Sequence, residues 1–149
     1  MKKMVMTVTL TAALIAMFST ACATNTGGIG PAKALLDSGN GYYEKGDYDK
    51  AIADYTQAIN TDPKYAEAYY KRGIAYFKKG DYDKAIADYT QAVGIDSKYA
   101  DAINDRGIAY AEKGDLDRAI ADWEASLKIN PDYANANHNL EIARKQRGD

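Results

Sequence analysis

The sequence predicts an all-α fold made of stacked helical hairpins. The segment KGDYDKAIADYTQA, which begins at Lys45, is repeated word for word from Lys79 and returns as KGDLDRAIADWEAS from Lys113. This fixed period of 34 residues indicates one small supersecondary unit stacked on copies of itself. Within each unit the apolar residues recur at helical spacing, and a Gly-Asp pair interrupts them halfway. Stacked helical hairpins usually form a groove that binds another polypeptide.

The first 30 residues differ in composition from the repeats. Lys2 and Lys3 precede Val5–Phe18, which is uncharged and mostly apolar, and small or polar residues follow. This order is typical of a secretory signal peptide, and the apolar segment is shorter than the roughly 20 residues that span a bilayer. We therefore predict that residues 1–21 are a signal peptide that is cleaved.

Cys22 is the only cysteine and ends the segment STAC at residues 19–22, which resembles the lipobox of bacterial lipoproteins. That family prefers leucine where Ser19 stands. The resemblance implies that Cys22 is lipidated, with palmitate among its acyl chains, and that residues 22–31 form the lipidated cysteine and a flexible tether. The alternative is cleavage by ordinary signal peptidase after Ala23, which would release a soluble exported protein.

Each repeat predicts a helix, a tight turn and a second helix. In the second repeat, apolar residues share one face of a helix over Ala66–Lys78, and Tyr82–Val93 has a second apolar face. Between them, Gly80 can adopt the left-handed conformation that ends a helix, and Asp81 can cap the next one. The Asp-Pro and Asn-Pro pairs at residues 62–63 and 130–131 predict the ends of second helices.

Two glycines, Gly73 and Gly107, lie inside predicted first helices, where glycine costs about 1 kcal/mol relative to alanine. We expect a close approach of the partner helix to compensate for this cost, because a Cβ atom would obstruct the approach. Ala85 and Ala119 are the small residues expected to face these glycines.

The pattern resembles the tetratricopeptide repeat, in which a large residue, Gly-x-x-Tyr, Ala, an aromatic residue, Ala and Pro recur over 34 residues. The resemblance covers about residues 32–132 and implies three units, at 32–65, 66–99 and 100–133, in a right-handed superhelix. The usual leucine before the glycine is absent. The residues that match are Leu35, Gly39, Tyr42, Ala51, Tyr55, Ala58 and Pro63; Tyr69, Gly73, Tyr76, Ala85, Tyr89 and Ala92; Ile103, Gly107, Tyr110, Ala119, Trp123 and Pro131.

The segment at residues 133–149 begins as a fourth unit, but polar residues replace those that would face a further hairpin. These are Asn137, Glu141 and Arg144, whereas Ala136, Leu140 and Ala143 keep a narrow apolar stripe. We therefore predict a capping helix, which repeat arrays require at their ends.

In this family the first helix of each hairpin lines the concave face, which implies a peptide-binding groove. Apolar side chains would form its floor, and asparagines would pair with the peptide backbone because they both donate and accept hydrogen bonds. The predicted groove residues are Asn40, Tyr43, Tyr70, Ile74, Phe77, Asp101, Asn104 and Ile108. The alternative is that Tyr70 and Phe77 pack between hairpins. If they line the groove, Tyr70→Ala with Phe77→Ala should weaken binding and leave the helices intact.

Chaperone-binding members of the family hold a C-terminal carboxylate with Lys, Asn, Asn, Lys and Arg. The matching positions here are Leu36, Asn40, Lys71, Asp101 and Asp105, so only Asn40 agrees. The two aspartates would repel a terminal carboxylate. We therefore expect a partner segment that carries Lys or Arg.

Charge and residue types argue against other classes of function. The net charge of −2, without a basic stripe, argues against nucleic acid as a partner. His138 is the only histidine and has neither a cysteine nor a second histidine near it in sequence for metal binding or nucleophilic catalysis. We predict no enzymatic activity, no metal site and no cofactor.

The sequence thus predicts a membrane-anchored interaction adaptor or scaffold in the bacterial cell envelope. Ala23, which follows the lipidated cysteine, resembles the sorting rule for the outer membrane and implies its periplasmic face. Two alternatives stay open: a soluble exported helper that holds client proteins, and a structural array that self-associates. A monomer is favoured, because the polar C-terminal helix opposes open-ended growth.

Overall fold

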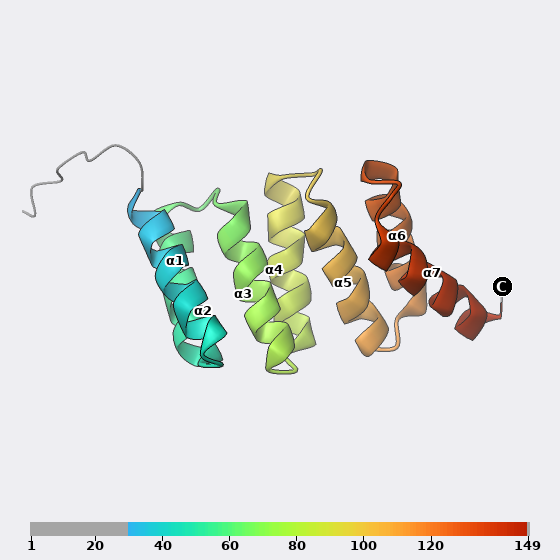
Figure 1. Cartoon of the computed structure of the whole chain (residues 1–149), viewed down its shortest axis with the longest axis horizontal. Coiled ribbons are helices and arrows are strands. Elements are labelled where there is room, and N and C mark those ends of the chain that lie inside the picture. Colours follow the sequence, from blue (N-terminus) through green and yellow to red (C-terminus); the bar gives the residue numbers. More distant parts are fainter. Residues whose placement is uncertain (1–29, 149) are drawn as a thin grey trace, which may run out of the picture.

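The computed structural model describes residues 30–148, and seven α-helices lie side by side in this part of the chain (Figure 1). They are α1 (Pro31–Glu44), α2 (Tyr48–Thr61), α3 (Ala66–Lys78), α4 (Tyr82–Ile95), α5 (Ala100–Glu112), α6 (Leu116–Ile129) and α7 (Ala134–Arg147). No strand occurs between residues 30 and 148. The predicted all-α solenoid of three hairpins and a C-terminal helix is confirmed. The predicted signal peptide, Cys22 and the tether up to residue 29 lie outside the described residues.

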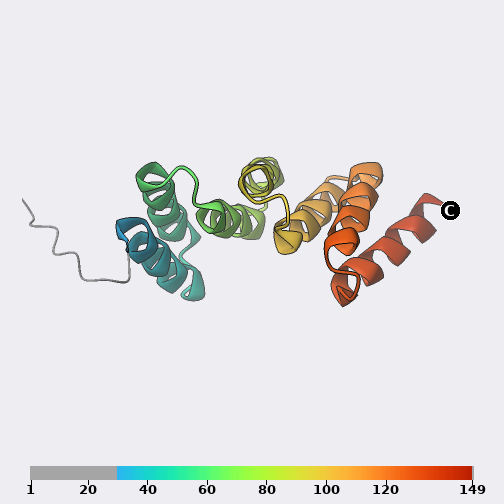
Figure 2. The same cartoon turned by 90° about the horizontal axis from the view of Figure 1, so that it is seen from above.

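The hairpins α1–α2, α3–α4 and α5–α6 follow one another along the long axis, and α7 packs against the last of them. Viewed from above, each hairpin is turned relative to the one before it (Figure 2). Every helix contacts the next helix in the chain, and α1 also contacts α3, as α5 contacts α7. None of the helices described is long and apolar enough to cross a membrane.

The tight turn inside each hairpin depends on a glycine with positive φ followed by an aspartate. Gly46, Gly80 and Gly114 have φ angles of 78°, 79° and 81°, a region that glycine enters without steric penalty. The aspartate that follows each glycine caps the second helix by accepting a hydrogen bond from a backbone N–H three residues later, as Asp81 does from Lys84. Both roles expected for the Gly-Asp pair are confirmed.

The second helices end at equivalent positions whether or not a proline follows. Helix α4 ends at Ile95 although Ser97 replaces proline, and α2 ends at the equivalent Thr61. In both cases the C-cap aspartate, Asp96 or Asp62, accepts a hydrogen bond of 3.0 Å from the backbone N–H two residues later. This local side-chain contact favours a turn over further helix. Proline is therefore not required to end these helices.

The glycines inside the first helices lie against an aromatic ring of the second helix. A Cβ atom on Gly39 would lie 2.5 Å from Cε1 of Tyr55, and one on Gly73 would lie 2.7 Å from Cε1 of Tyr89. The expected close approach is confirmed, but its source is an aromatic ring and not the small residues Ala85 and Ala119. Gly107 faces Trp123 in the same way, since a Cβ atom on it would lie 2.9 Å from Nε1 of the indole.

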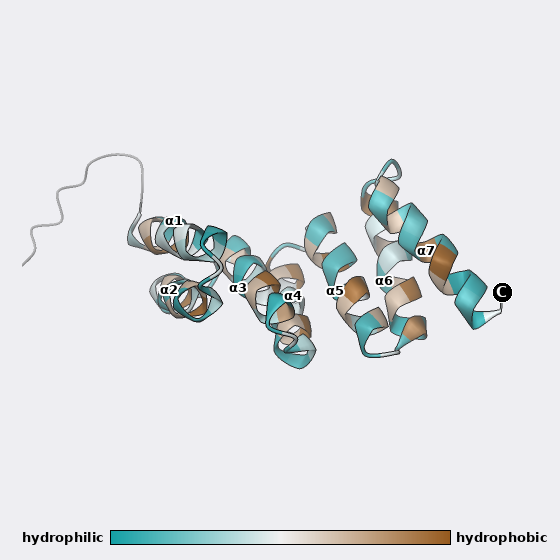
Figure 3. Ribbon diagram, turned by 60° about the horizontal axis from the view of Figure 1, so that its bottom comes forward, coloured by the Kyte–Doolittle hydropathy of each residue, from teal (hydrophilic) through white to brown (hydrophobic). Residues whose placement is uncertain are grey.

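Buried apolar residues in the described helices form three clusters, at successive places along the array. The last cluster contains Ala136, Leu140 and Ala143 of α7, which is the narrow apolar stripe expected for the capping helix. Figure 3 shows apolar and polar segments alternating along α7. Helix α7 therefore closes the core on one side and faces solvent on the other.

Arginine replaces the family leucine in the second and third hairpins, and it joins neighbouring hairpins. Arg72 donates two hydrogen bonds of 2.7 Å to the carboxylate of Asp88, which is 5% exposed, and a third of 3.0 Å to the hydroxyl of Thr56 in the preceding hairpin. Arg106 repeats this arrangement with Asp122 and Thr90. A polar junction thus replaces leucine packing.

A further set of ion pairs crosses these two junctions, and the one between α6 and α7, on the surface. Lys79 pairs with Asp49, Lys113 with Asp83, and Arg147 with Asp117. These aspartates are largely exposed, and such pairs add little to stability because solvent screens them.

Two alanine substitutions in α1 test the contact between glycine and ring. Gly39→Ala should destabilise the fold by about 1–3 kcal/mol, because the new methyl group overlaps the Tyr55 ring. Gly41→Ala is the matched control, because its Cβ would meet no atom within 4 Å, and it should stabilise the fold by about 0.5–1 kcal/mol. Urea unfolding curves measure both effects, and equal midpoints for the two variants would contradict the prediction.

Candidate functional site

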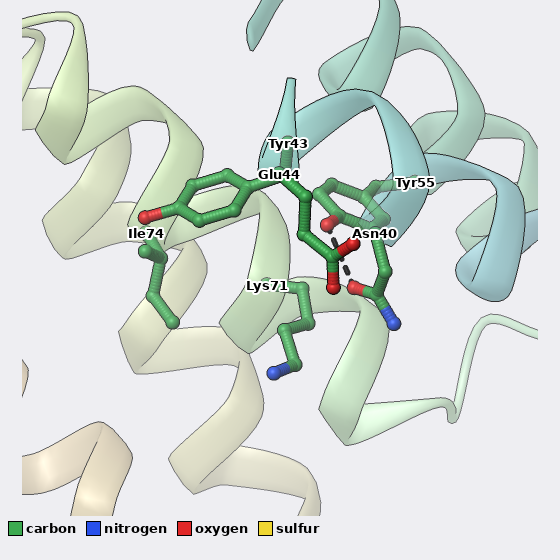
Figure 4. Close-up of a pocket in the computed structure, with 6 residues that line it drawn as sticks. All are labelled: Asn40, Tyr43, Glu44, Tyr55, Lys71 and Ile74. Carbon is green, nitrogen blue, oxygen red and sulfur yellow. Dashed lines mark hydrogen bonds between the residues drawn. The ribbon is translucent and has the colours of Figure 1, made fainter. Parts of the chain in front are cut away.

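Three pockets lie along one face of the part of the chain that the structure describes. The first pocket, of about 330 Å³, is lined by Asn40, Tyr43, Glu44, Tyr55, Lys71 and Ile74 (Figure 4). The second pocket, of about 190 Å³, is lined by Ile74, Phe77, Lys78, Tyr89, Asp105 and Ile108. The third pocket, of about 370 Å³, is lined by Ile108, Ala111, Glu112, Leu116, Trp123, Asn139, Ile142, Ala143 and Gln146.

These three pockets are built from equivalent positions of the repeat. Each residue of the first pocket corresponds, 34 positions later, to a residue of the second, and those positions recur once more in the third. Ile74 belongs to the first and second pockets, and Ile108 to the second and third. The pockets therefore join into one continuous surface from α1 to α7, which we call the groove.

An aromatic ring from the second helix contributes to each pocket, and in the first pocket it also holds another lining residue. In the first pocket, the hydroxyl of Tyr55 donates a hydrogen bond of 2.8 Å to Oδ1 of Asn40 (Figure 4). Burial raises the pKa of Tyr55 to about 12, so the phenol keeps its proton and remains a donor. The side chain of Asn40 is therefore held in place at the wall of the pocket.

Two rows of sequence-predicted residues line the groove. The structure brings Asn40, Tyr43, Ile74, Phe77 and Ile108 into the pockets. They come from the first helices α1, α3 and α5, as the family resemblance implies. That these residues bind a peptide stays a prediction, which their place in the pockets supports.

A third row, at Leu36, Tyr70 and Asn104, lies between hairpins and not in the pockets. Leu36 and Asn104 are each 2% exposed. The ring of Tyr70 packs between those of Tyr89 and Tyr99, with centroids 5.9 and 4.8 Å away. The three residues occupy equivalent positions of the repeat, on the side of each first helix that turns toward its neighbours. Asn104 is thus buried, and Tyr70 is half-buried and lines none of the three pockets, so a direct contact of either residue with a peptide stays a prediction.

This placement separates the roles of Tyr70 and Phe77. Tyr70 packs between hairpins, which is the alternative considered above, whereas Phe77 lines the second pocket and packs on Tyr82 with a centroid distance of 5.2 Å. The double variant Tyr70→Ala with Phe77→Ala would therefore combine a loss of stability with a change in the groove. Asp101 is exposed, accepts a hydrogen bond of 2.7 Å from Tyr133, and does not line the pockets.

Asp105 lines the second pocket; it was not among the predicted groove residues, although it is one of the positions that match the family's carboxylate clamp. Its two carboxylate oxygens accept hydrogen bonds from the Tyr70 hydroxyl, at 2.9 Å, and from Nδ2 of Asn104, at 3.0 Å. Burial raises the pKa of the Asp105 carboxyl above its ordinary value, and these hydrogen bonds offset part of the rise. Burial also raises the pKa of Tyr70, which keeps that hydroxyl protonated as a donor.

Other lining residues were missed, namely Glu44, Tyr55, Lys78 and Tyr89, whereas Lys71, like Asp105, was noted only as a clamp position. The repeat contained the signal that could have found them, because one set of six positions recurs in all three pockets. Between residues 30 and 148, no cluster of His, Cys, Asp and Glu is arranged to hold a metal ion. His138 lies on the exposed side of α7.

Family models match most of this repeat region. The TPR repeat model matches residues 39–80 and 107–148, and the tetratricopeptide repeat model matches residues 66–99. This chain belongs to the tetratricopeptide-repeat (TPR) family. TPR proteins are generally non-enzymatic scaffolds that bind proteins. A comparison with curated proteins found no match.

Solved TPR structures resemble this TPR chain over most of its length. The first TPR domain of Spaghetti (RPAP3), bound to the HSP90 peptide SRMEEVD, is 30% identical with a TM-score of 0.77, over 79% of this chain and 94% of that one. The second TPR domain of human RPAP3, in complex with the HSP70 peptide SGPTIEEVD, is 34% identical with a TM-score of 0.73, over 76% and 94%. MamA is 30% identical with a TM-score of 0.76, over 79% and 69%.

The raised pKa of Asp105 predicts how stability changes with pH. From the ordinary value of 3.8 up to the raised folded value, the folded protein holds more protons than the unfolded chain, so the free energy of unfolding falls as pH rises. Asp105→Asn removes this dependence and should gain stability relative to the wild type as pH rises through that window. Urea unfolding from pH 3.5 to 7 measures the difference, and parallel stability curves would contradict the prediction.

Proposed function

We propose that this TPR protein is a protein-interaction adaptor that binds an extended segment of a partner protein in the groove. The observation that carries the proposal is the continuity of the groove, since Ile74 and Ile108 are each shared by two pockets. A continuous, partly apolar surface suits an extended chain better than a compact small molecule. The peptide complexes of Spaghetti and human RPAP3 support a peptide ligand for the same fold.

The partner segment differs from the chaperone peptides in those two structures, which end in Glu-Glu-Val-Asp. Of the five positions that would hold such a terminus, Leu36 is buried, and Asp101 and Asp105 carry carboxylates. A terminal carboxylate would be repelled by the aspartates and would find no cation at Leu36. A segment that carries Lys or Arg suits the acidic surface at Asp101 and Asp105.

We also propose that the adaptor acts in the bacterial cell envelope, anchored through a lipid on Cys22 at the periplasmic face of the outer membrane. The support is the sequence, because a basic start and a short apolar segment precede Ser-Thr-Ala-Cys at residues 19–22. Several acyl chains on one residue would give stable anchoring. The TPR array would then reach its partners from the membrane surface.

The two ends of the described array favour a monomeric adaptor over a self-assembling one. At the first hairpin, Ser38 stands where Arg72 and Arg106 join hairpins, so this end lacks the guanidinium that would reach a preceding copy. At the last hairpin, Glu124 replaces the threonine that would receive such a guanidinium, and it pairs with Arg144 of α7 at 2.7 Å. Each end thus departs from the junction that stacks the inner hairpins.

A single substitution in the floor of the groove tests the adaptor function. Ile74→Gln should reduce partner binding by roughly tenfold or more, because a residue shared by two pockets loses its apolar surface. The matched control is Ile95→Gln, the same change at a residue 38% exposed at the end of α4 and outside the pockets. Quantitative pull-down from native envelope, with circular dichroism of each variant, measures the effect. Equal capture by all three proteins would place the binding surface elsewhere.

Substitution of the cysteine tests the anchor. Cys22→Ser should abolish incorporation of labelled palmitate in the producing bacterium and move the protein from the membrane fraction to the soluble periplasmic fraction, because no thiol is left to lipidate. A wild-type protein that is unlabelled and soluble would instead support the exported helper that holds client proteins.

A further inference from the structure

A carboxylate in the second pocket of the groove lacks the kind of cation that pairs with the buried carboxylates of the array. Asp88 and Asp122 each accept two hydrogen bonds from an arginine, whereas no lysine or arginine between residues 30 and 148 forms an ion pair with the half-buried Asp105. We propose that the second pocket binds one basic side chain of the partner segment on Asp105, and that Asn104 positions this carboxylate. The inference rests on the proposed peptide-binding function and identifies the residue that selects the partner.

The second pocket has the two kinds of surface that a long basic side chain requires. Ile74, Phe77 and Ile108 give it apolar walls, against which the aliphatic stem of lysine or arginine can pack. Asp105 lines the same pocket and supplies a carboxylate for the charged end. Each oxygen of this carboxylate accepts one hydrogen bond within the described chain. A carboxylate can accept about four, so capacity remains for a cation.

The charges around Asp105 favour a basic ligand. Lys78 also lines the second pocket, but it is exposed, whereas Asp105 is half-buried. A half-buried charge acts through a lower dielectric than an exposed one, which water and salt screen. Burial raises the pKa of the Asp105 carboxyl, and the neighbouring charge that adds to this rise is that of Asp101, a second carboxylate. A cation bound at Asp105 would therefore relieve an unfavourable concentration of negative charge.

The side-chain amide of Asn104 holds Asp105 at a cost to the fold. Asn104 is 2% exposed, and its Nδ2 donates a hydrogen bond of 3.0 Å to the carboxylate. Its Oδ1 is buried and receives no hydrogen bond from the part of the chain that the structure describes. A buried acceptor without a donor destabilises the folded state. Turning the amide over would bring Oδ1 against the carboxylate oxygens, which are acceptors as well, so Asp105 determines the orientation of the amide.

The other hairpins show that the repeat does not require a polar amide at this position. The equivalent residues are Leu36 in the first hairpin, which is also 2% exposed, and Tyr70 in the second. The Tyr70 hydroxyl reaches the same carboxylate from the neighbouring hairpin, with a hydrogen bond of 2.9 Å. Two hairpins thus direct polar groups at Asp105, and one of these groups leaves a buried acceptor unpaired. We attribute this cost to the binding function of the carboxylate.

Capped pentapeptides of the form Ala-Ala-X-Ala-Ala, in which X is lysine, arginine, norleucine or glutamate, test the site in NMR titrations of the full-length protein. Norleucine is the control, because it keeps the aliphatic stem of lysine and lacks the ammonium group. We expect the better of the lysine and arginine peptides to bind at least about tenfold more tightly than the norleucine peptide, because hydrogen bonds between charged groups are the stronger ones.

Two substitutions of the same kind separate the site from the overall charge of the protein. Asp105→Asn should lose most of the preference for a basic side chain over norleucine. Asp132→Asn removes one charge in the same way from an exposed residue outside the three pockets, so it should keep the preference. Equal losses in the two variants would contradict a specific role for Asp105.

The substitution Asn104→Leu tests the positioning role with two measurements that should move in opposite directions. The midpoint of urea unfolding should rise, because the residue of the first hairpin replaces a buried acceptor that has no donor. The preference for a basic side chain should fall, because Asp105 loses the hydrogen bond that holds one of its oxygens. A purely structural role would leave the peptide preference unchanged, and that result would overturn the positioning role.

The wild-type protein itself can overturn the proposed site. Binding of the norleucine peptide as tight as that of the basic peptides, tightest binding of the glutamate peptide, or no binding of any of the four would each do so. The adaptor function is judged separately by the pull-down with Ile74→Gln. A partner lost by that variant would sustain the groove even if the site for a basic side chain fails.

Discussion

The contact between a glycine of the first helix and an aromatic ring of the second is the constraint on which the rest of the structure depends. Because Gly39 has no side chain, the ring of Tyr55 can lie where a Cβ atom would come within 2.5 Å of it. The same ring forms part of the first pocket, and its hydroxyl holds Asn40. The packing of each hairpin and the shape of its pocket therefore depend on the same aromatic residue. A substitution that loosens the hairpin at this contact also alters the groove.

Polar contacts hold the hairpins together where the family usually packs leucine. Burial of an ion pair removes two charges from water, and the attraction between them compensates only with good geometry. Arg72 meets this requirement with two hydrogen bonds of 2.7 Å to Asp88 and one of 3.0 Å to Thr56. The guanidinium can make all three hydrogen bonds only when the second hairpin is placed so that Thr56 of the first hairpin lies within reach. The contact therefore favours one arrangement of the two hairpins. The first pocket, which Asn40 and Ile74 line from neighbouring hairpins, spans the same junction.

The sequence predicts the helices and turns well because their causes are local. The repeat period, the Gly-Asp pairs and the apolar spacing act within one hairpin, and each is found where expected. The row at Leu36, Tyr70 and Asn104 could not be assigned in this way, because its burial depends on how far each hairpin turns relative to the next. Helical periodicity gives the angle of a residue around its own axis and not the side that a neighbouring hairpin covers. The pairing of Arg72 with Asp88 and Thr56 likewise joins residues from different helices.

The division between repeated and varied residues explains how one framework can carry different pocket chemistry. The turn and the second helix are identical over 45–58 and 79–92, and this segment contributes the aromatic residue of the first two pockets. The lining residues Lys71 and Asp105 lie outside it, on the following first helices. Substitution at these positions can therefore change the charge of a pocket while the contact between glycine and ring persists. A repeat array of this kind can alter what it binds one pocket at a time.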